Sequence, residues 1–274
     1  MNAPAQDNSA FETKWKMAGL GGVNREEWTV YVPKGGVPRT QRQFSLFWYS
    51  DFIRRAIRGR GFKNAIELGC GRGTAGLYLN TYDGLDVTLV DLSEDALDLS
   101  RRNFAHHGGT GTFVAADVRH LPFPDGAFDV ACSIGLLEHF QDYREVMAET
   151  LRVLRPGGLM VSLNIPGKRS VQSLNAVYKR LIRPFRTTPP KKDYYRNNDT
   201  AEQYAAHAAA AGFVDLTITH VNPFPLFVPV YLPLDSALTY LDRGVARVRR
   251  LWREYPLETG PRLAQAHFLV GRKP

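Results

Sequence analysis

Cysteine is scarce in this chain, and long apolar runs are absent. Only two cysteines occur among 274 residues, Cys70 and Cys132. Both stand inside apolar segments, so we expect small core residues and neither a disulfide framework nor a metal site. No segment approaches the roughly 20 apolar residues of a membrane-spanning helix, and the polar residues 1–10 lack the apolar core of a signal peptide. These absences predict a reducing, cytoplasmic setting.

Catalytic nucleophiles and metal ligands do not cluster in the sequence either. There is no nucleophile with a base at a suitable spacing and no set of metal ligands, so we expect no metal. The net charge is +8, yet no nucleic-acid recognition motif accompanies it, and nucleic acid is not the expected partner. Most histidines match no motif and are expected to be ordinary helix, loop or strand residues: His106, His107, His120, His207, His220 and His267.

Short β-rich segments alternate with helical segments through much of the chain. The β-rich segments are Ala65–Leu68, Val87–Asp91, Gly111–Ala116, Phe128–Ile134 and Leu159–Ile165. The helical segments are Thr74–Thr81, Ser93–His107, Tyr143–Leu154 and Thr200–Ala211, and two more strands are expected at Phe213–Val221 and near Ala264–Val270. This alternation predicts an α/β fold with a largely parallel sheet and helices on both of its faces.

The most informative segment is a glycine-rich loop after the first strand, Glu67-Leu-Gly-Cys-Gly-Arg-Gly-Thr74. Its glycines carry no Cβ, so the backbone can come close to a ligand. The helix that follows offers unpaired N–H groups at the same place. Asp91 ends the next strand, where its carboxylate can accept both hydroxyls of a ribose. The segment therefore predicts a pocket for a nucleoside cofactor.

Two nucleoside cofactors compete for this loop. Gly71-Arg-Gly-Thr-Ala-Gly76 matches the G-x-G-x-x-G pattern of dinucleotide binding, and Asp91 stands twenty residues after Gly71. Glu67 favours the other cofactor. A negative charge beside the loop does not stabilise a pyrophosphate, but it stabilises the ammonium and sulfonium groups of S-adenosylmethionine.

Four segments resemble, in order, the motifs of class I S-adenosylmethionine-dependent methyltransferases of the small-molecule type. Glu67-x-Gly69-x-Gly71-x-Gly73 resembles the first motif, and Ala115-Ala-Asp117-Val-Arg-His-Leu-Pro resembles the end of the adenine-binding strand. Gly135-Leu-Leu-Glu-His139-Phe resembles the fourth motif, and Leu151-Arg-Val-Leu-Arg-Pro-Gly-Gly158 the turn into the fifth strand. The resemblance implies a Rossmann-like sheet of seven strands, mostly parallel, with the last strand antiparallel.

The resemblance also implies S-adenosylmethionine as cofactor and S-adenosylhomocysteine as product. It places Asp91 at the ribose and Asp117 at the adenine amine, with the N–H of Val118 at a ring nitrogen. A turn-capping aspartate is the alternative for Asp117. Glu138 is expected to be structural or to contact the methionine end. The residues that the resemblance assigns to the cofactor are Glu67, Gly69, Cys70, Gly71, Gly73, Asp91, Leu92, Asp117, Val118, Ser133 and His139.

The chemistry of methyl transfer needs alignment more than covalent help, because the sulfonium already activates the methyl group. An acceptor hydroxyl or carbon acid must also lose a proton, which suits a general base near neutral pH. His139, at the mouth of the expected pocket, is the candidate base. The histidine at this motif position can instead orient the cofactor or cap the following helix. Tyr194 and Tyr195 are candidate substrate contacts, and the acceptor atom (O, N, C or S) stays open.

Three segments fall outside the expected core. Arg39–Gly59 carries aromatic residues at helical spacing, which favour packing over ligand contact, although similar enzymes cover their cofactor with such helices. Lys168–Asn198 holds nine Lys or Arg and a single acidic residue, Asp193. Pro223–Pro261 begins with prolines and apolar residues and continues with a basic run of arginines from Arg243 to Arg253.

The two later segments admit a plain and a sharper interpretation. The plain one is a solvated basic surface and a proline-stiffened substrate lid. In the sharper one, basic side chains attract an anionic substrate or membrane surface while apolar ones contact acyl or isoprenoid groups. Because prolines exclude a regular helix across residues 223–233, we expect any membrane contact to come from a loop. Its apolar side chains are Phe224, Leu226, Phe227, Val228, Tyr231 and Leu232.

These observations divide the chain into six parts and predict one function. The parts are residues 1–62 (disordered tail and N-terminal cap helices), 63–166 (S-adenosylmethionine-binding core), 167–198 (basic insertion), 199–222 (core helix and strand), 223–262 (apolar and basic lid) and 263–274 (final core strand). The predicted function is methyl transfer to a small-molecule or lipid-like acceptor, in a cytoplasmic protein that can lie at the membrane periphery. The alternatives are methylation of a macromolecule and a catalytically inactive, cofactor-binding subunit.

Overall fold

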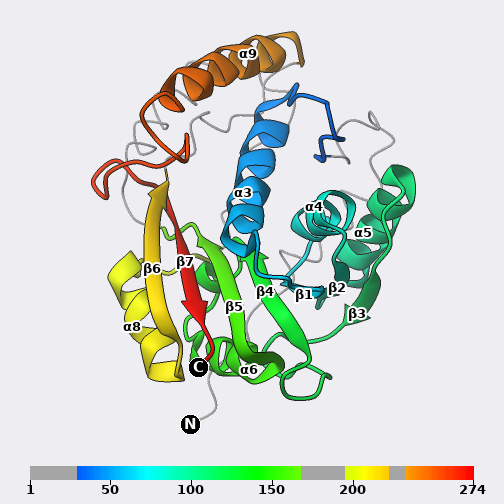
Figure 1. The fold of residues 1–274 in the computed structure, drawn as a ribbon, viewed down its shortest axis with the longest axis vertical. Coiled ribbons are helices and arrows are strands. Elements are labelled where there is room, and N and C mark those ends of the chain that lie inside the picture. Colours follow the sequence, from blue (N-terminus) through cyan, green and yellow to red (C-terminus); the bar gives the residue numbers. More distant parts are fainter. Residues whose placement is uncertain (1–29, 168–194, 222–231) are drawn as a thin grey trace.

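A mixed sheet of seven strands forms the centre of the described part of the chain (Figure 1). The computed structural model describes residues 30–167, 195–221 and 232–274. The strand order is β3-β2-β1-β4-β5-β7-β6, and β7 runs antiparallel to both of its neighbours. The strands are β1 (Asn64–Leu68), β2 (Asp86–Asp91), β3 (Thr112–Ala115), β4 (Phe128–Ile134), β5 (Leu154–Asn164), β6 (Val214–Val221) and β7 (Ala266–Arg272). The predicted sheet, with its antiparallel last strand, is confirmed.

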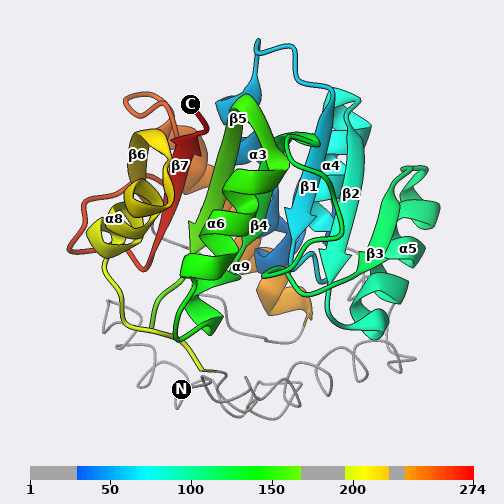
Figure 2. The same ribbon diagram turned by 90° about the horizontal axis from the view of Figure 1, so that it is seen from below.

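Helices cover both faces of this sheet, and Figure 2 shows α6 and α8 in front of the strands with α3 and α4 behind them. One core cluster joins the strands to α3 (Gln41–Ile57), α4 (Thr74–Asp83) and α5 (Glu94–His107). A second cluster joins the opposite face to α6 (Arg144–Val153) and α8 (Ala201–Ala211). The described helices are completed by a 3₁₀ turn, η1 (Leu137–His139), and by α9 (Leu232–Arg249).

Local sequence signals account for several helix boundaries. The side chain of Ser93 accepts a hydrogen bond from Ala96 N–H and begins α5 as expected. Thr200 and Gln203 form a reciprocal capping box at the start of α8. Gly212 ends α8 with a φ of 109°, a conformation that favours glycine.

The aromatic stripe predicted on Arg39–Gly59 packs into the core. Phe44 and Trp48 of α3 are buried, and Phe47 and Phe52 pack against the same cluster. Tyr255, from the segment after α9, donates a hydrogen bond to the carbonyl of Trp48 at 2.8 Å and so fastens the two elements together. The prediction that this stripe is packing is therefore confirmed.

Two elements differ from the sequence-based expectation. β5 begins at Leu154, not at Leu159, because Leu154 already pairs with Phe128 before a register irregularity. The α9 helix was not predicted, and it begins at Leu232, inside residues 223–233 where prolines were expected to exclude a helix. A proline in the first turn is tolerated, since its missing N–H would have no partner within the helix there. Residues 223–231 lie outside the described part.

No helix within the described ranges combines the length and the apolar character that crossing a membrane would need. Cys70 and Cys132 are buried free thiols, as expected from their apolar surroundings.

Candidate active site

The loop after β1 holds its three glycines in a left-handed backbone conformation that favours glycine. Gly69, Gly71 and Gly73 have φ values of 62°, 54° and 65°. A Cβ would lie 2.7 Å from Leu136 Cδ1 at Gly69 and 2.7 Å from Ser100 Oγ at Gly73. Both distances are too short for unstrained contact, so the loop lies tightly against its neighbours.

The α5 helix holds this loop in place from one side. Ser100 donates a hydrogen bond to the carbonyl of Gly71 at 3.1 Å, and the side-chain amide of Asn103 donates to the carbonyl of Arg72 at 2.9 Å. Cys70 N–H donates to the carbonyl of Val90 in β2 at 2.9 Å. Side chains of α5 thus satisfy two carbonyls of the loop, and β2 accepts one of its N–H groups, so the protein itself fixes the shape of the loop.

Asp91, at the carboxyl end of β2, is hydrogen-bonded to the glycine loop. Its Oδ2 accepts from Gly71 N–H at 2.8 Å, and its Oδ1 accepts from Ser93 N–H at 3.0 Å. These two amides orient the carboxylate at the carboxyl edge of the sheet, and a carboxylate is a strong acceptor for hydroxyl groups. The next residue, Leu92, is 55% exposed although it is apolar. An acidic group beside an exposed apolar side chain suits a ribose with an attached base.

Glu67 lies beneath the loop, buried in the central strand. Its Oε2 accepts from Gly76 N–H in the first turn of α4 at 2.7 Å. Burial raises the pKa of Glu67 to about 8, against the lowering effect of the N–H groups of Gly76 and Ala75. At neutral pH the carboxyl group is therefore largely protonated, and a nearby cation would favour its ionised form.

Asp117 follows β3 and is held by its own turn. Its Oδ1 accepts from the backbone N–H of Arg119 at 2.9 Å, and the guanidinium of Arg119 reaches Oδ2 at 2.6 Å. The hydrogen bonds from the Arg119 side chain lower the pKa of Asp117. This geometry matches the turn-capping alternative, and a contact to adenine stays a prediction. Val118 is buried beside it.

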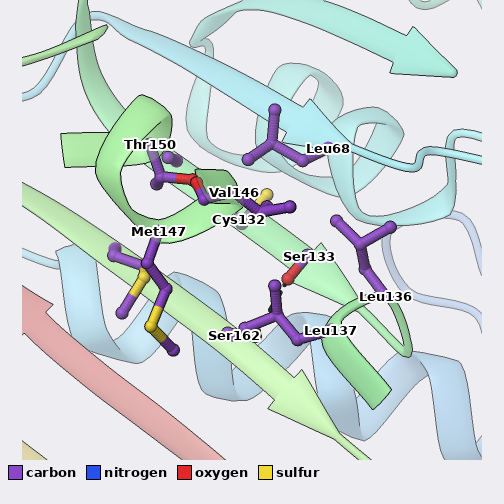
Figure 3. Close-up of a pocket in the computed structure, with 11 residues that line it drawn as sticks. Leu68, Cys132, Ser133, Leu136, Leu137, Val146, Met147, Thr150 and Ser162 are labelled. Atoms are coloured by element: carbon purple, nitrogen blue, oxygen red, sulfur yellow. Dashed lines mark hydrogen bonds between the residues drawn. The ribbon is translucent and has the colours of Figure 1, made fainter. Parts of the chain in front are cut away.

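Ser133, near the carboxyl end of β4, directs its hydroxyl into the protein. It forms a hydrogen bond of 3.0 Å with the hydroxyl of Ser162 in β5, which donates to Asn164 Oδ1 at 2.9 Å. Figure 3 shows this pair beside a small cavity that is also lined by Leu68 and by Met147 of α6. The cavity measures about 10 Å³, room for about one water molecule and too little for a methyl acceptor.

His139 ends the η1 turn after β4, and its ring orientation is set from a distant segment. Its Nδ1 lies 2.8 Å from the backbone carbonyl of Tyr195. A carbonyl only accepts, so Nδ1 carries the proton, and in the neutral ring Nε2 then carries the lone pair. The structure thus selects the tautomer in which Nε2 is the basic atom.

Asn197 fixes this turn, although no motif in the sequence marks it. Its side-chain amide donates to the carbonyls of Leu137 and Phe140, its backbone N–H donates to the carbonyl of Glu138, and its Oδ1 accepts from the hydroxyl of Tyr204. Its own carbonyl accepts from Gly167 N–H at 2.7 Å. Both flanks of the basic segment 168–194 therefore meet at the turn that carries His139.

The remaining candidates lie elsewhere or outside the described part. The other six histidines occupy helices, strands and a loop, as expected. Tyr195 is half exposed and contributes its carbonyl to His139. Tyr194 and Phe224 lie outside the described residues. Across the ranges that the structure describes, no three acidic, His or Cys side chains gather as metal ligands would.

Comparison with known proteins identifies the family. Residues 66–162 match the family described as a methyltransferase domain. Demethylmenaquinone methyltransferase from Thermus thermophilus is 34% identical over 126 residues, which are 45% of this chain and 57% of that protein. Residues 66–162 of this chain form a methyltransferase domain of the class I S-adenosylmethionine-dependent type.

Two further matches extend beyond the methyltransferase domain. Methyltransferase GfsG from Streptomyces halstedii is 29% identical over 192 residues, 68% of this chain and 66% of that protein. The chain thus spans less than two thirds of either curated relative. A solved structure from Thermotoga maritima, described as a possible histamine N-methyltransferase, has a TM-score of 0.56 at 14% identity. The match covers 97% of this chain and 100% of the Thermotoga chain. At that identity the likeness supports the fold alone.

Proposed function

We propose that this methyltransferase binds S-adenosylmethionine at the carboxyl edge of β1–β4 and methylates a small-molecule or lipid-like acceptor. The observation that carries the proposal is the glycine loop, which is packed too tightly for any Cβ at Gly69 and Gly73 and is hydrogen-bonded to Asp91. Such a loop lets backbone atoms approach a ligand. In open α/β sheets, ligands bind outside the carboxyl ends of the strands.

The residues of this edge fit the parts of the cofactor. Asp91 would accept the ribose hydroxyls, and the exposed side chain of Leu92 would cover one face of the adenine. Asp117 would accept from the adenine amine, with Val118 N–H at a ring nitrogen. Glu67 lies beneath the loop, where a cationic methionine end would favour its ionised form.

His139 is the proposed base for acceptors that must lose a proton. The cofactor supplies an activated methyl group, so the protein has to align the acceptor and remove its proton. The hydrogen bond from Nδ1 to Tyr195 leaves Nε2 as the atom that would take that proton. Asn197 would act as a positioning residue, because it holds the carbonyls on both sides of the turn.

The basic insertion expected at residues 167–198 is the proposed boundary of the acceptor site. Two of its described residues, Gly167 and Tyr195, are hydrogen-bonded to Asn197 and His139 at the turn after β4. A lipid-like acceptor also agrees with the relative that is named for demethylmenaquinone. Cationic side chains there suit an acceptor with an anionic or polar head.

Calorimetric titration of the purified protein tests the cofactor. S-adenosylmethionine and S-adenosylhomocysteine should bind, and NAD should not. Incubation with labelled S-adenosylmethionine and a panel of quinones, phenols and lipid extracts then tests the acceptor class. Binding of NAD without either adenosyl compound would refute the proposal. Cofactor binding with label transferred only to protein or nucleic acid would favour a macromolecular acceptor.

A further inference from the structure

The α9 helix turns its polar side toward the protein. Asp235 accepts hydrogen bonds from the backbone and side-chain N–H groups of Gln41 in α3, at 3.2 and 2.6 Å. Thr239, one turn later, is 1% exposed and donates to the carbonyl of Asp235. Asp242 continues this side, and burial followed by the charge of Asp235 raises its pKa to about 6. Arg249, half-buried, donates to the carbonyl of Glu258. The inner side of α9 thus combines hydrogen bonds to α3 and to the segment after the helix with the buried Ala246, which joins the core cluster.

The outer side of α9 and its continuation to residue 253 is apolar. Leu241, Val245, Val248 and Trp252 recur at spacings of three and four residues, so they share one helical face. These four, together with Tyr240 and Leu251 beside them, are between 50% and 76% exposed. A surface helix of a globular protein normally has the opposite orientation, with its apolar stripe on the core. A contiguous exposed stripe of this kind marks an interaction site.

The exposed charges beside the stripe are mainly basic, and the exposed acidic Glu254 directly follows the stripe. Arg247, Arg250 and Arg253 are exposed beside it, and over residues 236–253, all of which the structure describes, no exposed residue is acidic. The two aspartates of α9 are on its inner side. An anionic partner is therefore electrostatically favoured. A second copy of the chain, docked face to face, would bring the arginines of both helices together.

The position of α9 agrees with a flat external partner. Figure 1 shows the helix at the periphery of the molecule, beyond the upper ends of α3 and β6. β6 runs parallel to β5, because both strands are antiparallel to β7. α9 follows β6 in the chain and lies beyond its carboxyl end, which is also the carboxyl end of β5. A surface that held α9 would face the edge where the glycine loop lies.

We propose that α9 is an interfacial helix that binds the surface of an anionic lipid bilayer. Its leucine, valine and tryptophan side chains would enter the boundary between headgroups and acyl chains, and its arginines would pair with anionic headgroups. This contact differs from the loop contact expected from the sequence, which rests on residues outside the described part. It needs neither cofactor nor acceptor, so it stands apart from the proposed methyl transfer.

Vesicle flotation with the full-length protein tests this contact. The protein should float with vesicles of phosphatidylcholine containing about one third phosphatidylglycerol, and far less with phosphatidylcholine alone or in about 0.5 M NaCl. Leu241→Ser with Val245→Ser should weaken the apparent affinity at least about tenfold. Leu263→Ser, an equally exposed leucine outside α9, is the matched control and should bind like the wild type.

The arginines have their own arm of the experiment. Arg247→Gln with Arg250→Gln should weaken binding about fivefold for each charge removed, whereas Arg58→Gln, exposed at the end of α3, should not. Circular dichroism should be unchanged in every variant, because the sites are exposed. Failure of the wild type to float, or undiminished flotation of the double serine variant, would overturn the proposal. The proposal would also be overturned if light scattering showed that the wild type is a dimer and that the double serine variant is a monomer. That result would assign the apolar stripe to contact with a second copy of the chain.

Discussion

The imidazole of His139 donates its Nδ1 proton to the backbone carbonyl of Tyr195, at a distance of 2.8 Å. The two residues are separated by 56 positions in the chain, and the bond joins the turn after β4 to the end of the basic segment 168–194. It places the lone pair of the neutral ring on Nε2. If His139 is the base, its replacement should affect the rate of methyl transfer. If His139 only orients the cofactor, its replacement should affect cofactor affinity.

His139→Asn should lower kcat by about 10²–10⁴ and leave cofactor affinity nearly unchanged, because an asparagine amide can replace the Nδ1 donor but supplies no basic Nε2. Initial rates across pH, with an acceptor found in the panel above, measure the effect. The acidic limb of the wild-type rate profile should disappear in the variant. If the rate persists and cofactor affinity falls, His139 orients the cofactor and is not the base.

Asp91→Ala should weaken S-adenosylmethionine binding by about 1.5–3 kcal/mol, roughly ten- to hundredfold, through lost charge-assisted bonds to the ribose. Asp91→Asn separates this effect from loop shape, since its carbonyl can still accept from Gly71 N–H. Asp95→Ala, an exposed residue of the first turn of α5, is the control. If calorimetry gave equal affinities for Asp91→Asn and the wild type, the negative charge of Asp91 would not contribute to cofactor binding.

An S-adenosylmethionine analogue without the exocyclic adenine amine distinguishes the two roles of Asp117. If its carboxylate accepts from that amine, the wild type should discriminate against the analogue and Asp117→Ala should not. Equal discrimination by both proteins would leave Asp117 as a turn cap for Arg119. Competition against labelled S-adenosylhomocysteine measures both affinities in one assay.

The cofactor-free protein should lose stability between pH about 4.5 and pH about 8 through Glu67. Burial raises the folded-state pKa of Glu67 from 4.5 to about 8, so the folded state binds more protons than the unfolded state in this window. The stabilisation is complete below pH about 4.5 and declines by at most about 1.4 kcal/mol per pH unit toward pH 8.

Glu67→Gln keeps an acceptor for Gly76 N–H and removes the titration, so denaturant unfolding of this variant should lack the slope. The proposal that Glu67 meets the cationic end of the cofactor adds a second measurement. Calorimetry in buffers of different ionisation enthalpy should detect proton release by the wild type near pH 7. Identical heats after buffer correction in the wild type and the variant would separate Glu67 from the cofactor.

Asn197→Ala should lower the free energy of unfolding by about 2 kcal/mol or more. The substitution leaves the carbonyls of Leu137 and Phe140 and the buried hydroxyl of Tyr204 without their partner. Asn198→Ala changes the exposed neighbour and should cost little. Urea unfolding of both variants measures the difference. Equal midpoints would contradict the stabilising role of the Asn197 hydrogen bonds to the turn after β4.

The sequence by itself determined the order of elements and the identity of the glycine loop. These follow from local physics: strand and helix periods, the Ser93 cap of α5, and the absence of a Cβ at Gly69 and Gly73. The same locality explains the match to a family whose motifs are short segments at strand ends. The boundaries that differed, such as Leu154 in β5, depend on which neighbour a strand pairs with.

Only the tertiary structure decided the environments of the candidate residues. The high pKa of Glu67 comes from burial by elements that are distant in sequence, and the tautomer of His139 comes from a carbonyl 56 positions away. The outward face of α9 was equally invisible, because helical periodicity reveals an apolar side but not the direction in which the fold turns it. Composition and spacing act along the chain, whereas burial, hydrogen-bond partners and exposure are set by segments that meet only after folding.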